Sequence, residues 1–145
     1  MNWNEAEELL DRPETTFAAV SRDGREHVSD RRGIAPVLEL LDRDPGFLQG
    51  AAVADKVVGK AAALLFVRGG VEGVYARTLS EKAAAVLQAH GLRVACLEKV
   101  PYIVNRAGDG MCPMERCVWE IDDPLMAEAA LRQRLRELGG SVREN

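Results

Sequence analysis

The sequence contains no long apolar segment. None of its hydrophobic runs reaches the roughly 18 residues that a membrane-spanning helix needs. Its first residues, MNWNEAEELLDR, are acidic, whereas an export signal begins with basic residues followed by an apolar stretch. These two absences argue against membrane insertion and export, and they predict a cytoplasmic protein with no membrane partner.

Cysteine and histidine are scarce, with three cysteines and two histidines among 145 residues. An odd number of cysteines in a chain without a leader favours reduced thiols over a disulfide framework. Cys112 and Cys117 are separated by a spacing that turns them about 140° from each other on a helix. Neither His27 nor His90 lies in a paired metal-ligand motif. We therefore expect no metal site and no cofactor.

No sign of charge dominates the sequence. The chain has 19 basic and 23 acidic residues, a formal net charge of -4 and a pI near 5.3, and the two signs are interspersed. Proteins that track nucleic acid usually carry a basic face, so the composition argues against a nucleic acid polymer as partner. With 47% hydrophobic residues, the chain is expected to fold as one domain over residues 1–145.

What the sequence does contain is an alternation of helical and extended patterns. Asp23-Gly24 lies between two β-prone runs and predicts a hairpin. Gly70 and Gly91 are typical helix stops, and Thr78 to Glu81 has the pattern of a capping box. Strands are predicted at 47–54, 71–77 and 92–98, and helices at 3–10, 34–43, 56–70, 81–90, from Pro113 onward and at 123–139.

A hairpin followed by alternating helices and strands predicts the α/β class. Each crossover between parallel strands must lay its helix over the sheet, because the apolar stripe of the helix needs a surface to cover. The expected architecture is therefore a three-layer α/β/α arrangement around a mixed sheet.

The first candidate site lies where the strand at 47–54 meets the helix at 56–70. Ligands of open α/β sheets collect beyond the carboxyl ends of the strands. Asp55 is expected as the N-cap of this helix, and Lys60 is expected at the border of its buried stripe, able to point into a cleft. The alternatives are a bare cap and a lysine stem that covers apolar surface. Gly59 disfavours the helix by about 1 kcal/mol relative to alanine, which indicates close approach by a ligand or another backbone.

The second candidate site is the glycine-rich loop that contains Asn105 and Arg106. A guanidinium and an amide at this position can bind the carboxylate or phosphate of a small ligand. The alternative is a turn in which the Asn and Asp side chains satisfy their own backbone. Both interpretations remain open from the sequence.

The segment GMCPMERC is the third candidate. Pro113 favours the first helical position, which makes Cys112 the N-cap and Glu115 the third residue of a helix. The positive end of the helix would stabilise a Cys112 thiolate, with Glu115 as a proton carrier. The alternative is an ordinary helix start in which Glu115 reaches back to the N-cap amide.

Three blocks in order, ADKVVGKAAALL, YARTLSEKAAAVL and PYIVNRAGDGMCPME, resemble an uncharacterised bacterial and archaeal family, a domain of unknown function grouped with the cytidine-deaminase-like fold. The resemblance runs from about Phe17 to Trp119. It implies a deaminase-type mixed sheet with a pocket of that shape. Zinc deaminases carry a His or Cys followed by Glu at one helix start and P-C-x-x-C at the next. Here those starts read DKVVGKAA and TLSEKAA, which offer no zinc ligand of that kind.

The leading hypothesis is a metal-independent protein that binds a small molecule or a nucleotide-like ligand through Asp55, Lys60, Asn105 and Arg106. A second hypothesis is an enzyme that attacks through Cys112 with the help of Glu115, or a degenerate deaminase-type hydrolase. A third is a homo-oligomer that uses Met111, Met114 and Trp119 at its interface. The sequence identifies neither the ligand nor a reaction.

Overall fold

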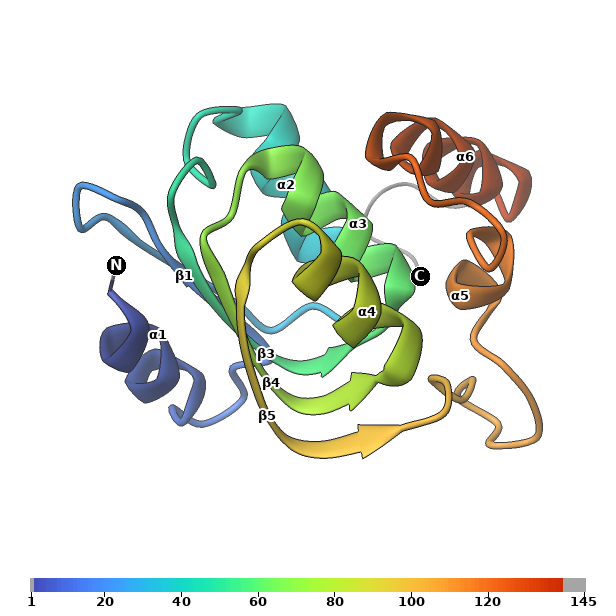
Figure 1. Cartoon of the computed structure of the whole chain (residues 1–145), viewed down its shortest axis with the longest axis horizontal. Helices are drawn as coiled ribbons and strands as arrows, with labels where there is room; N and C mark the ends of the chain where they lie inside the picture. The colour runs from blue at the N-terminus through green and yellow to red at the C-terminus, as the bar shows by residue number, and fades with distance from the viewer. Residues whose placement is uncertain (1, 140–145) are drawn as a thin grey trace.

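The sheet places an antiparallel hairpin beside three parallel strands (Figure 1). The computed structural model describes residues 2–139, and its five strands follow the order β2-β1-β3-β4-β5. β1 is antiparallel to both neighbours, whereas β3, β4 and β5 run parallel. The strands are β1 (Phe17–Val20), β2 (Glu26–Ser29), β3 (Ala52–Val58), β4 (Gly73–Ser80) and β5 (Arg93–Val100). The predicted α/β class with a mixed sheet is thereby confirmed.

Helices flank the sheet on both faces (Figure 1). On one face α1 (Trp3–Leu10) buries Ala6, Leu9 and Leu10 against small residues of β1 and β3. The larger core lies on the opposite face. The helices of that side are α2 (Ala35–Arg43), α3 (Lys60–Gly69), α4 (Glu81–Ala89), α5 (Pro113–Cys117) and α6 (Pro124–Glu137).

The central helix of the larger core is α3. It contacts α2, α4, α5 and α6 as well as β3. Residues 60–66 are all buried, which matches a helix that is apolar around most of its circumference. Its end at Gly70, which adopts a left-handed conformation with φ of 83°, confirms the expected stop.

The junction between β3 and α3 differs from the sequence prediction. The strand runs through Asp55 to Val58 and pairs with both β1 and β4, and the helix begins at Lys60 with Gly59 as its N-cap. Asp55 is therefore a strand residue and caps no helix. A continuous apolar run does not distinguish a buried strand from a buried helix, and pairing with two neighbours decided for the strand.

The starts of β3 and α4 also differ from the sequence prediction. Residues 47–50 form turns, so β3 begins later than the predicted strand at 47–54. β4 extends to Ser80, whose Oγ accepts a hydrogen bond of 3.1 Å from the backbone N–H of Ala83. Ser80 rather than Thr78 is thus the N-cap of α4. The hairpin at Asp23-Gly24 is confirmed, with φ of 94° at Gly24.

Candidate functional site

A pocket of about 720 Å³ lies at the carboxyl end of β3, beside the loop that follows β5. Its floor is the end of β3 and the first turn of α3. One wall is formed by Thr16 and the segment 31–34, which follows β2, and the other by residues 103–107 and 112–115, which follow β5. The loop after β5 and α5 lies beyond the arrowheads of the strands, so this wall comes from a distant part of the sequence (Figure 1).

Asp55 lies on the floor of the pocket and is 7% exposed. Removal from water raises the pKa of Asp55 to about 8, although the backbone N–H groups of Val57 and Lys56 oppose the shift. The N–H of Val57 lies 3.4 Å from Asp55 Oδ1. At neutral pH the side chain is therefore largely an uncharged carboxylic acid, able to donate as well as accept a hydrogen bond.

Glu115, which lies in α5, contacts a different helix, α3. Its Oε1 accepts hydrogen bonds from the backbone N–H groups of Lys60 and, at 3.4 Å, of Ala61, in the first turn of α3. The N–H of Cys112 instead donates to the carbonyl of Ile103 at 2.8 Å, so the expected return of Glu115 to this N-cap amide is wrong. A negative charge at the amino end of a helix is stabilised by the unpaired N–H groups there.

The same carboxyl group is deeply buried, with Glu115 2% exposed. Burial raises the pKa of Glu115, and the backbone N–H groups of Lys60, Ala61 and Ile103 and the hydroxyl of Ser80 oppose the shift. Within residues 2–139, the second oxygen, Oε2, is buried and has no hydrogen-bond partner. Glu115 is therefore held to the first turn of α3 through Oε1, while the Ser80 hydroxyl and the Ile103 N–H lie near the same carboxyl group at the wall of the pocket.

Gly59 allows this contact. A Cβ at position 59 would lie 2.5 Å from Glu115 Oε1 and 2.9 Å from Ile103 Cγ1. The φ of Gly59 is -101°, which any residue can adopt, so the requirement for glycine is one of space. The close approach expected at this position exists, and it is made by a side chain of the same protein.

Lys60 does not point into the pocket. Its Nζ donates to the carbonyl oxygen of Trp119 and pairs with Asp122 Oδ1, both at 2.9 Å. Lys82 donates to the same carbonyl at 3.2 Å, and its Nζ lies 4.1 Å from the centre of the Trp119 ring. The prediction that Lys60 faces a cleft is therefore wrong. Its side chain instead connects α3 to the segment that follows α5, through the contacts with Trp119 and Asp122.

Asn105 belongs to a self-contained turn. Its Oδ1 accepts from the N–H groups of Gly108 and Asp109, and its Nδ2 donates to Asp109 Oδ1 at 2.9 Å. An antiparallel bridge between Val104 and Met111 closes the base of the loop. The turn interpretation therefore describes the hydrogen bonds of Asn105, although the residue still borders the pocket. Arg106, which is exposed, lies at the rim.

Cys112 is the N-cap of α5 and Pro113 follows at its start, as the sequence predicts. The thiol is partly buried and borders the pocket. Met114, expected at an interface between subunits, is buried in the core instead. Asp55, Asn105, Arg106, Cys112 and Glu115 thus border one pocket, whereas Lys60 does not. Whether these residues bind a ligand or react stays a prediction.

Sequence reasoning missed the basic residues of the first wall. Arg31 and Arg32 border the pocket from the segment after β2. Lys56 also borders it, but from β3 rather than from this wall. Arg31 also forms an ion pair of 3.4 Å with Glu39. The signal in the sequence was the pair Arg31-Arg32 before Gly33, but nothing in the order of the residues placed it opposite Arg106.

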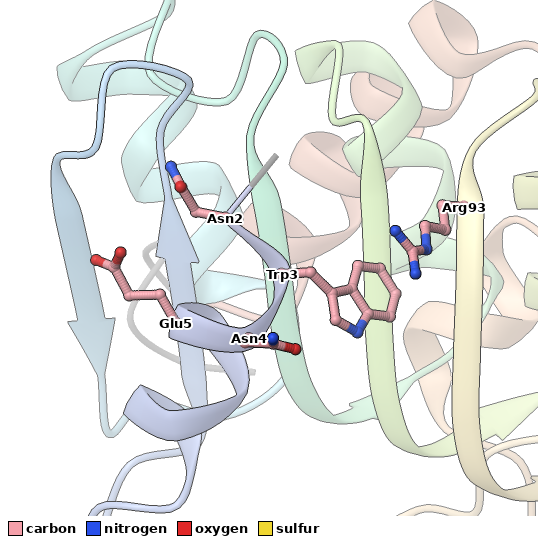
Figure 2. Close-up of a pocket in the computed structure, with 5 residues that line it drawn as sticks. All are labelled: Asn2, Trp3, Asn4, Glu5 and Arg93. Atoms are coloured by element: carbon pink, nitrogen blue, oxygen red, sulfur yellow. The ribbon is translucent and has the colours of Figure 1, made fainter.

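A second, smaller pocket of about 390 Å³ lies between the start of α1 and β5 (Figure 2). Trp3 points from α1 toward Arg93, whose guanidinium carbon is 4.9 Å from the centre of the indole ring. Asn2, Asn4 and Glu5, which come from the same end of the chain, also line it. It brings together no buried carboxyl groups, so we take the larger pocket as the candidate site.

Two further observations concern the described residues, 2–139. No group of three or more His, Cys, Asp or Glu side chains is arranged so that it could hold a metal ion. None of the helices in this part of the chain is long and apolar enough to cross a membrane.

The comparisons with known proteins agree with one another. The model of the family TM1506, domain of unknown function (DUF1893), matches residues 5–135. The crystal structure of a DUF1893 family protein (TM1506) from Thermotoga maritima is similar, with a TM-score of 0.79 and 32% sequence identity over 92% of this chain and 88% of that chain. No curated protein matches the sequence.

Proposed function

The chain belongs to the DUF1893 family, and we propose that it binds a small nucleotide-like anion in the pocket at the carboxyl end of β3. The binding does not depend on a metal ion. The observation that carries the proposal is the charge arrangement of the pocket. Four basic side chains border it, from the segment after β2, from β3 and from the loop after β5: Arg31, Arg32, Lys56 and Arg106.

The basic side chains come from both walls of the pocket. Arg31 and Arg32 belong to the wall after β2, and Arg106 belongs to the wall after β5. Guanidinium groups bind phosphate and carboxylate through paired hydrogen bonds and also stack on planar rings. A ligand that carries an anionic group and a flat ring would therefore contact both walls.

The size and lining of the pocket fit a ligand of this class. Small-molecule sites are typically clefts of about 300–1,000 Å³ with mainly apolar walls and a few polar groups. The pocket has about 720 Å³, and Val57, Ala62 and Ile103 are among its apolar residues. A nucleoside monophosphate has the required combination of an anion, hydroxyl groups and a planar ring.

The cytidine-deaminase-like assignment of the fold is part of the same proposal. What supports it is the mixed sheet with the pocket at the carboxyl end of its parallel strand β3. In open α/β sheets, ligands bind beyond the carboxyl ends of the parallel strands.

Isothermal titration calorimetry with AMP and CMP tests the proposal. Removing one charge-assisted hydrogen bond costs about 1.5–3 kcal/mol, so Arg106→Gln is expected to weaken binding by about tenfold or more. Arg136→Gln is the matched control, because Arg136 lies in the last turn of α6 and donates to Gln133. Absence of binding to either nucleotide, or equal loss in both variants, would contradict the proposal.

A further inference from the structure

We infer that the carboxyl group of Asp55 recognises the ring of the ligand through paired hydrogen bonds, one to a ring nitrogen and one to an N–H group beside it. This inference rests on the proposed binding function and deepens it, because it specifies which part of a nucleotide lies at the floor of the pocket. The phosphate then lies among the basic side chains of the border, and the ring lies inward.

The carboxyl group of Asp55 is buried in the protein but open to the pocket. Asp55 is 7% exposed and borders the pocket from β3. The N–H of Val57 lies 3.4 Å from Oδ1, which is long for a hydrogen bond, and the N–H of Lys56 donates to the carbonyl of Thr16 at 3.1 Å. Within residues 2–139, the side-chain oxygen that is sealed from solvent without a partner is Glu115 Oε2, not Asp55 Oδ2. Oδ2 can therefore be reached from the pocket.

Two exposed apolar side chains border the same pocket as Asp55. Val57, two residues further along β3, is 46% exposed, and Val104, in the loop after β5, is 55% exposed. The half-buried Ile103 borders the pocket next to Val104 in the sequence. A planar ring that covers these side chains removes apolar surface from water, and apolar walls around a few polar groups are typical of small-molecule sites. The ring of a nucleotide is therefore the part that fits beside Asp55.

The basic side chains of the border are more exposed than Asp55. Arg32 and Arg106 are exposed, and Arg31 and Lys56 are half-buried. A phosphate at the floor would lose its water and lie beside a carboxyl group, whereas at the border it meets guanidinium groups that can bind it through paired hydrogen bonds. The anionic end of the ligand is therefore expected at the border, with the ring at the floor.

A protonated carboxyl group offers a donor and an acceptor side by side. Burial raises the pKa of Asp55 to about 8, so this form predominates at neutral pH. In adenine and in cytosine, a ring nitrogen accepts a hydrogen bond and the amino group beside it donates one. An ionised carboxylate has only acceptors and would leave the ring nitrogen opposite one of them. Recognition of either ring therefore requires the protonated form of Asp55.

Other charged or titratable groups face the same pocket from the segment after β2, from β3 and from the part of the chain after β5: Arg31, Arg32, Lys56, Arg106, Cys112 and Glu115. Thiols and buried carboxyl groups can ionise in the same pH range as Asp55. A ligand without a ring and a variant that cannot ionise at position 55 are therefore needed to isolate the contribution of Asp55.

The experiment compares a nucleotide with a phosphate ligand that lacks the ring. The tighter of AMP and CMP, and methyl riboside 5-phosphate, are titrated into the native protein at pH 7 and pH 9 by isothermal titration calorimetry. The protonated fraction of a group with a pKa of about 8 falls about tenfold between these values. The affinity for the nucleotide is expected to fall about tenfold as well, whereas that for methyl riboside 5-phosphate is expected to change by less than about twofold.

Two substitutions of Asp55 separate recognition from a structural role. Asp55→Asn carries an amide, which also offers a donor and an acceptor, and is expected to bind the nucleotide at pH 7 within about threefold of the native protein and without the decline to pH 9. Asp55→Ala is expected to bind the nucleotide about tenfold more weakly at pH 7 and methyl riboside 5-phosphate unchanged. Asp42→Asn is the matched control, because Asp42 is exposed on α2, where it pairs with Arg132, and it is expected to keep the native profile.

Nucleotide affinity of the native protein that does not change between pH 7 and pH 9 would overturn the inference and leave the proposed function intact. A decline that persists in Asp55→Asn, or that is equal for both ligands, would assign the titration to another group and have the same consequence. A purely structural Asp55 would lower the affinity for both ligands equally in Asp55→Ala, which would also overturn the inference alone. Failure of AMP, CMP and methyl riboside 5-phosphate to bind would overturn the proposed function and the inference together.

Discussion

The carboxylate of Glu115 accepts a hydrogen bond from the backbone N–H of Lys60, a residue 55 positions earlier in the chain. This contact joins α5 to the start of α3 and sets one wall of the candidate pocket against its floor. It also uses the part of α3 that would otherwise be open to an external anion. The predictions that follow concern this contact, the carboxyl group on the floor and the basic residues of the border.

Replacement of Gly59 by alanine is expected to destabilise the protein by about 2 kcal/mol, because the new Cβ displaces Glu115 and leaves the amides of α3 without their acceptor. Urea unfolding followed by circular dichroism measures the change. Gly46→Ala is the control, because a Cβ there meets nothing within 4 Å. If Gly59→Ala lowered the free energy of unfolding no more than Gly46→Ala does, the close approach of Glu115 to Gly59 would not contribute to stability.

The two substitutions of Glu115 are expected to differ in stability. Glu115→Ala removes the acceptor for two N–H groups and leaves a cavity, for a loss of about 2–3 kcal/mol in the free energy of unfolding. Glu115→Gln keeps an acceptor of the same shape and is expected to lose about 1 kcal/mol or less. Chemical denaturation of both variants at neutral pH checks the order. Equal losses would mean that the contact with α3 is unimportant.

The stability of the protein is expected to fall as the pH rises from the ordinary Asp value of 3.8 to about 8. The pKa of Asp55 is raised to about 8 in the folded protein by burial, so the folded state holds a proton that the unfolded state has released. This contribution is fully present below pH 3.8 and is lost by the time the pH passes the folded value. Other carboxyl groups add their own dependence, and the comparison with Asp55→Asn isolates this one.

Asp55→Asn cannot ionise and is expected to lack this part of the decline. The measurement is the difference in unfolding free energy between the variant and the native protein from pH 4 to pH 9. The difference should move in favour of the variant as the pH rises and become constant above about 8. A difference that does not change with pH would show that Asp55 has an ordinary pKa.

Lys56 and Lys60 are expected to have different roles: Lys60 contributes to stability, and Lys56 contributes to nucleotide binding. Lys60→Met loses the partly buried hydrogen bond to the carbonyl of Trp119 and is expected to reduce stability by about 1–2 kcal/mol. It is expected to change AMP or CMP affinity by no more than about twofold. Lys56→Met, at the border of the pocket, is expected to weaken nucleotide binding by about fivefold with little loss of stability. If Lys60→Met weakened nucleotide binding and Lys56→Met did not, Lys60 rather than Lys56 would belong to the binding site.

Cys112 provides a test that separates ligand binding from attack by a thiolate. Cys112→Ser is expected to retain nucleotide affinity within about twofold, because binding rests on the basic residues. Saturating nucleotide is expected to slow alkylation of Cys112 by iodoacetamide, mapped by mass spectrometry against Cys117, whose Sγ lies 3.6 Å from the carbonyl of Ala130. Turnover that vanishes in Cys112→Ser would instead favour the enzyme hypothesis.

Local signals were sufficient for much of the fold. The hairpin at Asp23-Gly24, the stop at Gly70 and the start of α5 at Cys112-Pro113 depend on the backbone preferences of a few adjacent residues. The order of helices and strands then follows from periodicity. The boundary between β3 and α3 does not follow from periodicity, because the pairing of residues 55–58 with neighbouring strands outweighed their helical pattern.

The sequence by itself determined the class of the fold and the edge of the sheet at which the candidate pocket lies, since turn chemistry and hydrophobic periodicity act over short distances. Only the tertiary structure decided that Lys60 turns toward Trp119, that Glu115 reaches α3, and that Arg31 and Arg32 border the same pocket as Arg106. These outcomes depend on which distant segments pack together. Burial then sets the pKa of Asp55, and burial is a property of the whole packed core.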